Sequence, residues 1–403
     1  MGDICRKAKI EQPNIYLNYH KKSSKENDIK KPNIKYYKQI TNKCQSGSYE
    51  IKYSGPFEVF KLESYYQENN FLGCYLAIGN NDTKNIDIYK IKSKDNIELL
   101  YTIKVEYETI SEIKYFYDLF NDINYLTALI NKKTRILIWK IVNENKYDLI
   151  LNLQESVLSG GIGLAWNPKR YDYYYLLFDR DKSILVFNYK VQSGCMSSNV
   201  YLEKYDFINN KSLEKISDIN WERLYKSFPV YLNRKNYIAI LNLFSLDLIE
   251  IFKTGIKKEI TKLNLIPKNI HNIHIKNINA IITEENDEDE FLYSIYHTYC
   301  GNNVEKNILF KINLKNKEIL FKTELDIDNL ITITFWNKKY LLLFELKSTI
   351  IHLFNTKTCK IEKKFINIKG GGLFTAKKLV INNNEQLLFV LDFNGNLNLW
   401  INE

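Results

Sequence analysis

Short runs in which apolar and polar residues alternate follow one another along most of the chain, separated by Asn, Asp, Gly and Pro. The clearest example lies within residues 160–188, where Ile162–Trp166, Tyr173–Phe178 and Ser183–Phe187 form three such runs. An Asn-Pro pair separates the first two, and an Asp-Arg-Asp tripeptide separates the last two. A period of two is typical of β-strands, and proline ends strand pairing because it lacks an N–H group. The sequence therefore predicts three strands joined by two turns in this stretch.

A three-stranded ribbon of this kind cannot bury both of its faces alone, so it needs similar ribbons beside it. Aromatic residues close apolar runs at six positions, namely Tyr89, Trp139, Phe187, Phe252, Phe354 and Trp400. The intervals between them are roughly 46 to 65 residues, with one of about twice the period, which is the scale of four-stranded blade repeats. The long interval contains the runs Phe291–Tyr296 and Asn307–Asn313, which supply a further unit. Seven repeated units are therefore predicted.

The segment Leu164-Ala-Trp-Asn-Pro168, followed after a gap by Leu176–Asn188, resembles a WD repeat. That repeat has an apolar-x-Trp-x-Pro strand, a turn, a small-residue strand, an Asp turn and a strand ending in Trp-Asp. Here no Gly-His pair precedes the unit, and Phe187-Asn188 stands in place of Trp-Asp, so the family's side-chain hydrogen-bond network is missing. The resemblance implies an all-β fold, a closed β-propeller of seven four-stranded blades. Six or eight blades are alternatives because units four and five are long.

The two ends of the propeller are expected to meet. The last unit contains Leu387–Leu391 and Leu397–Trp400, and the sequence ends three residues later, without a further strand. In closed propellers of the WD-repeat family an N-terminal strand fills the outer place of the last blade, which removes exposed sheet edges. We expect Ile34–Ile40 to be that strand.

This assignment gives two parts of the chain. Residues 1–33 form a polar, lysine-rich N-terminal extension, and residues 34–403 form the WD-repeat-like propeller. Within the propeller we expect insertions at about residues 191–236 and 255–290, where the spacing exceeds that of a minimal blade.

Charge and cysteine content bear on partners and location. Lysine and arginine outnumber acidic residues, which gives a formal net charge of +10. Because Asn, Ile and Tyr are also frequent, the excess reflects either codon usage in an AT-rich genome or a basic binding surface. Six cysteines are scattered singly, and neither a signal peptide nor an apolar run of about 18 residues occurs, so we expect free thiols and no membrane span. The expected location is intracellular, in the cytoplasm, the nucleus or both.

The sequence contains no motif for catalysis or cofactor binding. Phosphate-loop, dinucleotide-binding and G-x-S-x-G patterns are missing, so we expect no cofactor and no catalytic residues. His271, His274, His297 and Cys300 have the residue types of zinc ligands, but pairs three positions apart in a strand face opposite sides, so no metal site is expected. The aromatic cluster Tyr171–Tyr175 could stack nucleic-acid bases, yet aromatic residues on strands normally pack in the core.

An acidic cluster is the one candidate binding site that the sequence offers. It lies between two predicted strands of unit five and consists of Glu284, Glu285, Asp287, Glu288, Asp289 and Glu290. The cluster is either a solvated loop or a docking strip for a basic partner.

The resemblance to WD repeats implies a non-catalytic scaffold or adaptor that binds other proteins within a larger intracellular complex. The main alternative is a propeller that binds nucleic acid or histones through a basic surface. A phosphoinositide-binding propeller is less expected, because its Phe-Arg-Arg-Gly or Leu-Arg-Arg-Gly motif needs an Arg-Arg pair, which this chain lacks. A propeller enzyme is also less expected, because no acid–base constellation can be named.

Overall fold

The structure is a computed structural model that describes residues 31–402, apart from segments of which the longest are 44–49, 63–72, 160–164, 217–223, 251–260, 265–272, 367–372 and 381–385. Most of the expected N-terminal extension, residues 1–30, therefore lies outside the described residues. The elements that the structure defines are all strands. Within this part of the chain no helix is long and apolar enough to cross a membrane.

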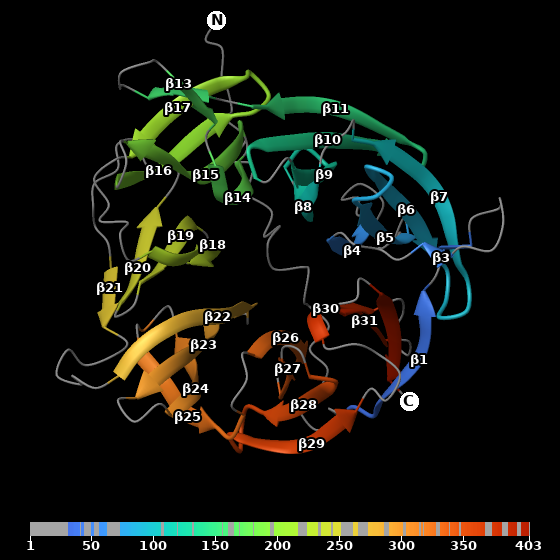
Figure 1. Ribbon diagram of the computed structural model, residues 1–403, viewed down its shortest axis with the longest axis vertical. Coiled ribbons are helices and arrows are strands. Elements are labelled where there is room, and N and C mark those ends of the chain that lie inside the picture. The colour runs from blue at the N-terminus through green and yellow to red at the C-terminus, as the bar shows by residue number, and fades with distance from the viewer. Residues whose placement is uncertain are drawn as a thin grey trace, which may run out of the picture.

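The described strands form seven antiparallel four-stranded sheets and two short two-stranded sheets. We number the four-stranded sheets as blades 1 to 7 in chain order. Figure 1 shows them side by side around a ring, with the first strand of each blade nearest the centre. The prediction of an all-β propeller built from four-stranded blades is confirmed.

The first four blades span residues 57–264. Blade 1 consists of β4 (Phe57–Leu62), β5 (Gly73–Asn80), β6 (Asn85–Ile91) and β7 (Ile97–Lys104). Blade 2 consists of β8 (Ile110–Asp118), β9 (Ile123–Ile130), β10 (Arg135–Asn143) and β11 (Lys146–Leu153). Blade 3 consists of β14 (Arg170–Asp179), β15 (Lys182–Ser193), β16 (Ser197–Asp206) and β17 (Lys211–Ile216). Blade 4 consists of β18 (Leu224–Leu232), β19 (Lys235–Asn242), β20 (Ser245–Glu250) and β21 (Thr261–Asn264).

The remaining three blades span residues 273–402, and the last of them also contains the first strand of the described chain. Blade 5 consists of β22 (Ile273–Glu285), β23 (Glu290–Cys300), β24 (Val304–Asn313) and β25 (Glu318–Leu325). Blade 6 consists of β26 (Ile331–Asn337), β27 (Tyr340–Glu345), β28 (Ile350–Asn355) and β29 (Lys360–Ile366). Blade 7 consists of β30 (Leu373–Val380), β31 (Gln386–Asp392), β32 (Leu397–Asn402) and β1 (Ile34–Ile40). The two-stranded sheets pair β2 (Asn42–Lys43) with β3 (Glu50–Ile51) and β12 (Ser156–Ser159) with β13 (Ala165–Pro168).

The first strand of the described chain completes the last blade. β1 pairs antiparallel with β32, with Ile34 opposite Asn402 and Ile40 opposite Leu397. Both isoleucines are buried, and the Tyr36 ring meets the Trp400 ring edge-on at 6.1 Å between centroids. The strand predicted at Ile34–Ile40 therefore lies at the outer edge of blade 7.

Blades pack face to face through the strands at their centres. In β5 and β9 every residue after the first is buried, because a blade inside a ring has a neighbour on each face. Apolar clusters join blades 1 and 2, 2 and 3, 5 and 6, and 6 and 7, and another joins blade 7 to blade 1. Continuous apolar runs in the sequence thus correspond to strands that are covered on both sides.

Asn and Asp residues end many strands and begin the turns. The side-chain oxygens of Asn80, Asp118, Asp206, Asn337 and Asn355 each accept hydrogen bonds from the backbone N–H groups two and three residues further on. These Asx turns reverse the chain without help from a neighbouring strand. They explain why Asn- and Asp-containing segments separate the apolar runs.

The stretch at residues 160–188 differs from its prediction. Trp166 lies in β13, which pairs with β12 as a separate two-stranded sheet, and Trp166 is opposite Leu158. Blade 3 begins only at Arg170, so the run ending in Trp166 is not the first strand of this blade. The Asn-Pro pair, which was expected to form a turn, lies at the end of β13. The blade does not need that strand, because β16 and β17 fill its third and fourth places.

The same finding changes the assignment of the segment 191–236, which was expected to be an insertion. Its residues include the end of β15, all of β16, β17 and β18, and the start of β19, so most of the expected insertion consists of blade strands. Ser, Lys and Asn are frequent there, which hid the alternation that marks the other blades. Of the second expected insertion, residues 255–290, the structure describes β21, β22 and the first residue of β23.

Candidate functional site

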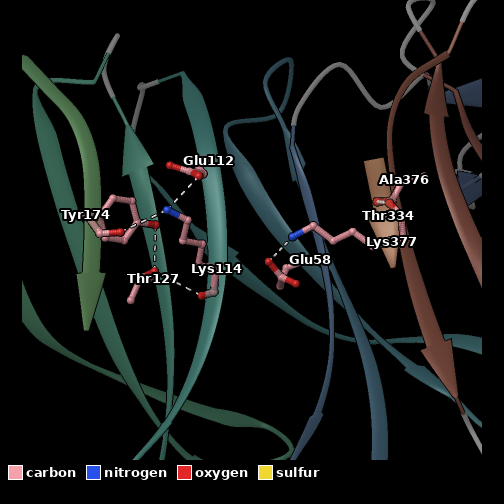
Figure 2. Close-up of polar contacts among 8 residues, drawn as sticks. All are labelled: Glu58, Glu112, Lys114, Thr127, Tyr174, Thr334, Ala376 and Lys377. Carbon is pink, nitrogen blue, oxygen red and sulfur yellow. Dashed lines mark hydrogen bonds and ion pairs between the residues drawn. The ribbon is translucent and has the colours of Figure 1, made fainter. Parts of the chain in front are cut away.

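The innermost strands carry charged side chains where blade 7 meets blade 1. Lys377 on β30 forms an ion pair with Glu58 on β4, and Figure 2 shows the two side chains reaching across the blade junction. Glu58 is 15% exposed and Lys377 is 32% exposed. Burial raises the pKa of the Glu58 carboxyl, while the ammonium groups of Lys377 and Lys114 act in the opposite direction.

A second charged group lies between blades 2 and 3. The Lys114 ammonium on β8 is 3.0 Å from Oε1 of Glu112 and donates a hydrogen bond to the backbone carbonyl of Tyr174 on β14 at 3.2 Å. It also lies 4.4 Å from the ring centroid of Tyr174 and 4.9 Å from that of Tyr175. Carboxylate, carbonyl and π-face contacts all favour a cation, so they hold Lys114 between the two blades.

A chain of hydroxyl groups extends this contact (Figure 2). Thr127 Oγ1 donates to the Lys114 carbonyl at 3.2 Å and lies 2.9 Å from the Tyr174 hydroxyl. Because Thr127 already donates its hydroxyl proton to the Lys114 carbonyl, the Tyr174 hydroxyl is the donor in its hydrogen bond with Thr127. Burial raises the pKa of Tyr174 well above its ordinary value, so this donor stays protonated at neutral pH.

Blades 6 and 7 are joined in a similar way, through the hydrogen bond from Thr334 Oγ1 to the Ala376 carbonyl at 3.0 Å. We call the eight residues of Figure 2 the inner wall, namely Glu58, Glu112, Lys114, Thr127, Tyr174, Thr334, Ala376 and Lys377. Its carboxylates lie beside ammonium groups and its hydroxyls are bonded to neighbouring strands. This arrangement supplies cohesion between blades and a rigid frame for the loops around the ring.

A further polar contact joins the outer parts of blades 1 and 2. Glu144, in the turn between β10 and β11, accepts hydrogen bonds from the Tyr75 hydroxyl at 2.6 Å and the Lys90 ammonium at 2.5 Å. These two bonds lower the pKa of Glu144. Burial and the Glu144 carboxylate together raise the pKa of Tyr75, so the phenol remains a donor.

Gly73 makes this contact sensitive to one substitution. Its φ is +141°, and a Cβ atom there would lie 2.7 Å from the Tyr75 hydroxyl oxygen. We expect Gly73→Ala to lower the free energy of unfolding by about 2 kcal/mol, because the substitution strains the backbone and displaces Tyr75 from Glu144. Urea denaturation measures the effect. Gly79→Ala, where the nearest atom would be 3.1 Å away and φ is ordinary, should cost less; equal costs would contradict the explanation.

The acidic cluster lies at the tip of the hairpin formed by β22 and β23. Glu284 and Glu285 end β22, with Glu284 opposite Phe291 and Glu285 opposite Glu290 at the start of β23. Asp287, Glu288 and Asp289 lie outside the described residues. The described members of the cluster thus belong to the ends of the two strands, and the docking role of the cluster stays a prediction.

The other sequence candidates divide between core and strand positions. Tyr171 and Tyr174 are completely buried, which confirms that they pack in the core. His274 is opposite Tyr299 and His297 is opposite Asn277 on the paired strands β22 and β23, while His271 lies outside the described residues. Across the residues that the structure describes, no group of three or more His, Cys, Asp and Glu side chains is placed to hold a metal ion.

Sequence reasoning missed the inner wall. Its charged residues occur in the first strands of blades 1, 2 and 7. A signal was present, because Glu112 and Lys114 lie two positions apart and so on one face of a strand that is rich in apolar and aromatic residues. The partner of Glu58 could not be found in this way, because Lys377 is 319 residues distant.

Known proteins resemble this chain in structure but not in sequence. No protein-family model and no curated protein sequence matches it. The crystal structure of BBS1N in complex with ARL6DN, soaked with mercury, matches with a TM-score of 0.55 at 8% identity, over 87% of this chain and 94% of that chain. The same complex soaked with lead matches with a TM-score of 0.52 at 8% identity, over 85% of this chain and 91% of that chain. At this identity the likeness shows a shared β-propeller fold.

Proposed function

We propose that this protein is a non-catalytic β-propeller scaffold that holds other proteins together within a larger complex. The main observation in support is the ring of blades. In it, charged and hydroxyl groups of the inner strands form ion pairs and hydrogen bonds with the adjacent blade. Side chains used in this way stiffen the frame, and a rigid frame presents its loops and outer strands for binding. The structural neighbour BBS1N is in a complex with a second protein, ARL6DN, which supports protein partners for a chain of this fold.

The proposal also includes the closure of the ring, the repeat family, the division of the chain and the location of the protein. The seven four-stranded sheets form a closed ring in solution, with β1 as the strand that completes blade 7. The blades are degenerate WD repeats, residues 1–33 are an extension of a propeller spanning residues 34–403, and the protein acts inside the cell, in the cytoplasm or nucleus. The pairing of β1 with β32 supports the closure, and the blade-length period supports the repeat origin.

Affinity purification tests the function. The tagged full-length protein is purified from its own cells at about 150 mM salt, where exposed charge–charge attraction is largely screened, with and without nuclease. Mass spectrometry should identify a stoichiometric set of proteins that survives nuclease. Recovery of the protein alone would contradict the scaffold proposal, and recovery with nucleic acid as the retained partner would favour the basic-surface alternative.

A further inference from the structure

The outer strands of the blades differ in their charge. β7 and β11 each contain one lysine and one acidic residue, β17 contains two lysines and one glutamate, and β25 contains one lysine and two glutamates. In contrast, β29 has three lysines and one glutamate, and β1 has two lysines and no acidic residue. Figure 1 shows β29 and β1 following one another along the outside of the ring.

Contacts between β29 and the residues just before β1 bring the lysines of the two strands into one surface. The Lys363 ammonium donates to Asn33 Oδ1 at 2.8 Å, and the Lys31 ammonium is 3.0 Å from Oε2 of Glu362. Residues just before β1 therefore run against β29. We call this surface the basic strip, and its exposed lysines are Lys31, Lys35, Lys357, Lys360, Lys363 and Lys364.

Two simpler explanations account for the presence of charged residues on this surface but not for their positive net charge. Charged residues on an edge strand prevent pairing with other chains, yet β7 and β11 meet that need with balanced charges. A lysine-rich composition would give every outer strand a similar excess of lysine, whereas β25 has more glutamates than lysines. The excess of positive charge is largest on the neighbouring outer strands of blades 6 and 7, where β29 and β1 each have two more lysines than acidic residues. On β17 and on β21, the outer strand of blade 4, the excess is one lysine.

The basic strip also contains an exposed apolar side chain. Ile366 at the end of β29 is 61% exposed, more than any other large hydrophobic side chain that the structure describes as exposed. A nucleic-acid backbone would neutralise the lysines and leave Ile366 in water. A peptide with carboxylates and an apolar side chain would cover both the lysines and Ile366. Among the described strands of its sheet, β29 is paired only with β28, so a peptide could pair along its other edge.

We propose that the basic strip binds an acidic segment of a partner protein in an extended conformation along β29. Side chains at alternate positions of such a segment are about 6.6 Å apart, which flexible lysine side chains can follow. Carboxylates of the segment pair with the lysines, and an apolar residue covers Ile366. This inference rests on the proposed scaffold function and names the kind of partner that the scaffold holds.

Fluorescence anisotropy with the full-length protein tests the proposal. The probe is a fluorescein-labelled peptide of about twelve residues in which Glu alternates with Val and Ser, long enough to span one strand. In the strip variant, Lys360, Lys363 and Lys364 are each replaced by Glu. The matched control replaces Lys92, Lys146 and Lys211 by Glu, which are exposed lysines at the outer hairpins of blades 1 to 3.

We expect the strip variant to bind the peptide at least tenfold more weakly than the wild type, and the control to differ less than twofold. Equal losses in both variants, or no loss in either, would overturn the proposal. Tighter binding of a single-stranded oligonucleotide of equal charge would also overturn it, in favour of nucleic acid. Matching melting curves of the two variants ensure that folding does not explain a difference.

The affinity purification separates this proposal from the function on which it rests. If the strip variant retains every partner of the wild type, and the peptide binds both proteins alike, the basic strip is not the docking surface while the scaffold function stands. If the wild type retains no protein at all, the scaffold function itself fails.

Discussion

Deletion of residues 1–41 is expected to lower the melting temperature by roughly 5 to 10 °C, because it removes β1 from blade 7. The deletion exposes the edge of β32 and the apolar surface that Ile34 and Ile40 cover. Burial of each isoleucine is worth roughly 1.5 to 3 kcal/mol, and the backbone pairing with β32 adds to this. Differential scanning fluorimetry measures the shift.

The control is deletion of residues 1–30, which keeps β1 together with the ion pair between Lys31 and Glu362. It should leave the melting temperature nearly unchanged. If deletion of residues 1–41 has no larger effect than this control, β1 does not close the ring in solution.

Replacement of Lys377 by Met is expected to lower the free energy of unfolding by about 3 kcal/mol at pH 7.5, because it leaves the Glu58 carboxylate without its partner in a largely buried site. The double variant that also carries Glu58→Gln should recover most of this loss, since the uncompensated charge is gone. Urea denaturation of the two variants and the wild type measures both effects.

The loss in the Lys377→Met variant should depend on pH. Burial already raises the pKa of Glu58, and removal of the ammonium raises it further. A carboxyl whose pKa is raised in the folded state costs stability as pH rises above its unfolded value of about 4.3. The variant should therefore approach the wild type near pH 4.5 and diverge towards pH 7.5. A loss independent of pH would show that packing of the lysine stem, and not its charge, is what the variant removes.

Much of this fold is readable from the sequence because its strands carry local signals. The apolar runs that Tyr89, Trp139 and Phe354 mark are the strands β6, β10 and β28. Such runs are recognisable because turn residues that fold by themselves, such as Asn80 and Asp118, end neighbouring strands. The place of β1 beside β32, at the outer edge of the last blade, was also predicted, because the resemblance to WD repeats implies it.

Blade 3 shows where local signals mislead. The run ending in Trp166 has the alternation of a strand, and its described end lies in β13, but β13 pairs with β12 and not with blade 3. Alternation predicts a strand and says nothing of which strand it pairs with. The polar strands β16 and β17 were missed for the opposite reason, since their many polar residues weaken the pattern.

The inner wall and the basic strip depend on contacts between distant parts of the chain. Lys363 and Asn33 are 330 residues apart in sequence, and Lys377 and Glu58 are 319 residues apart. The arrangement of the blades around a ring brings such residues together, so they become visible as a site only once the order of the blades is known. The acidic cluster Glu284–Glu290, in contrast, is continuous in sequence, so it is visible there without knowledge of the fold.

The most direct test of the scaffold function is the mass and composition of the native particle. The protein is purified from its cells under mild conditions, treated with nuclease, and analysed by size-exclusion chromatography with light scattering and mass spectrometry. We predict a particle well above the 47.8 kDa of one chain that contains at least one other polypeptide in stoichiometric amount. A particle of 47.8 kDa that contains this chain alone would contradict the account.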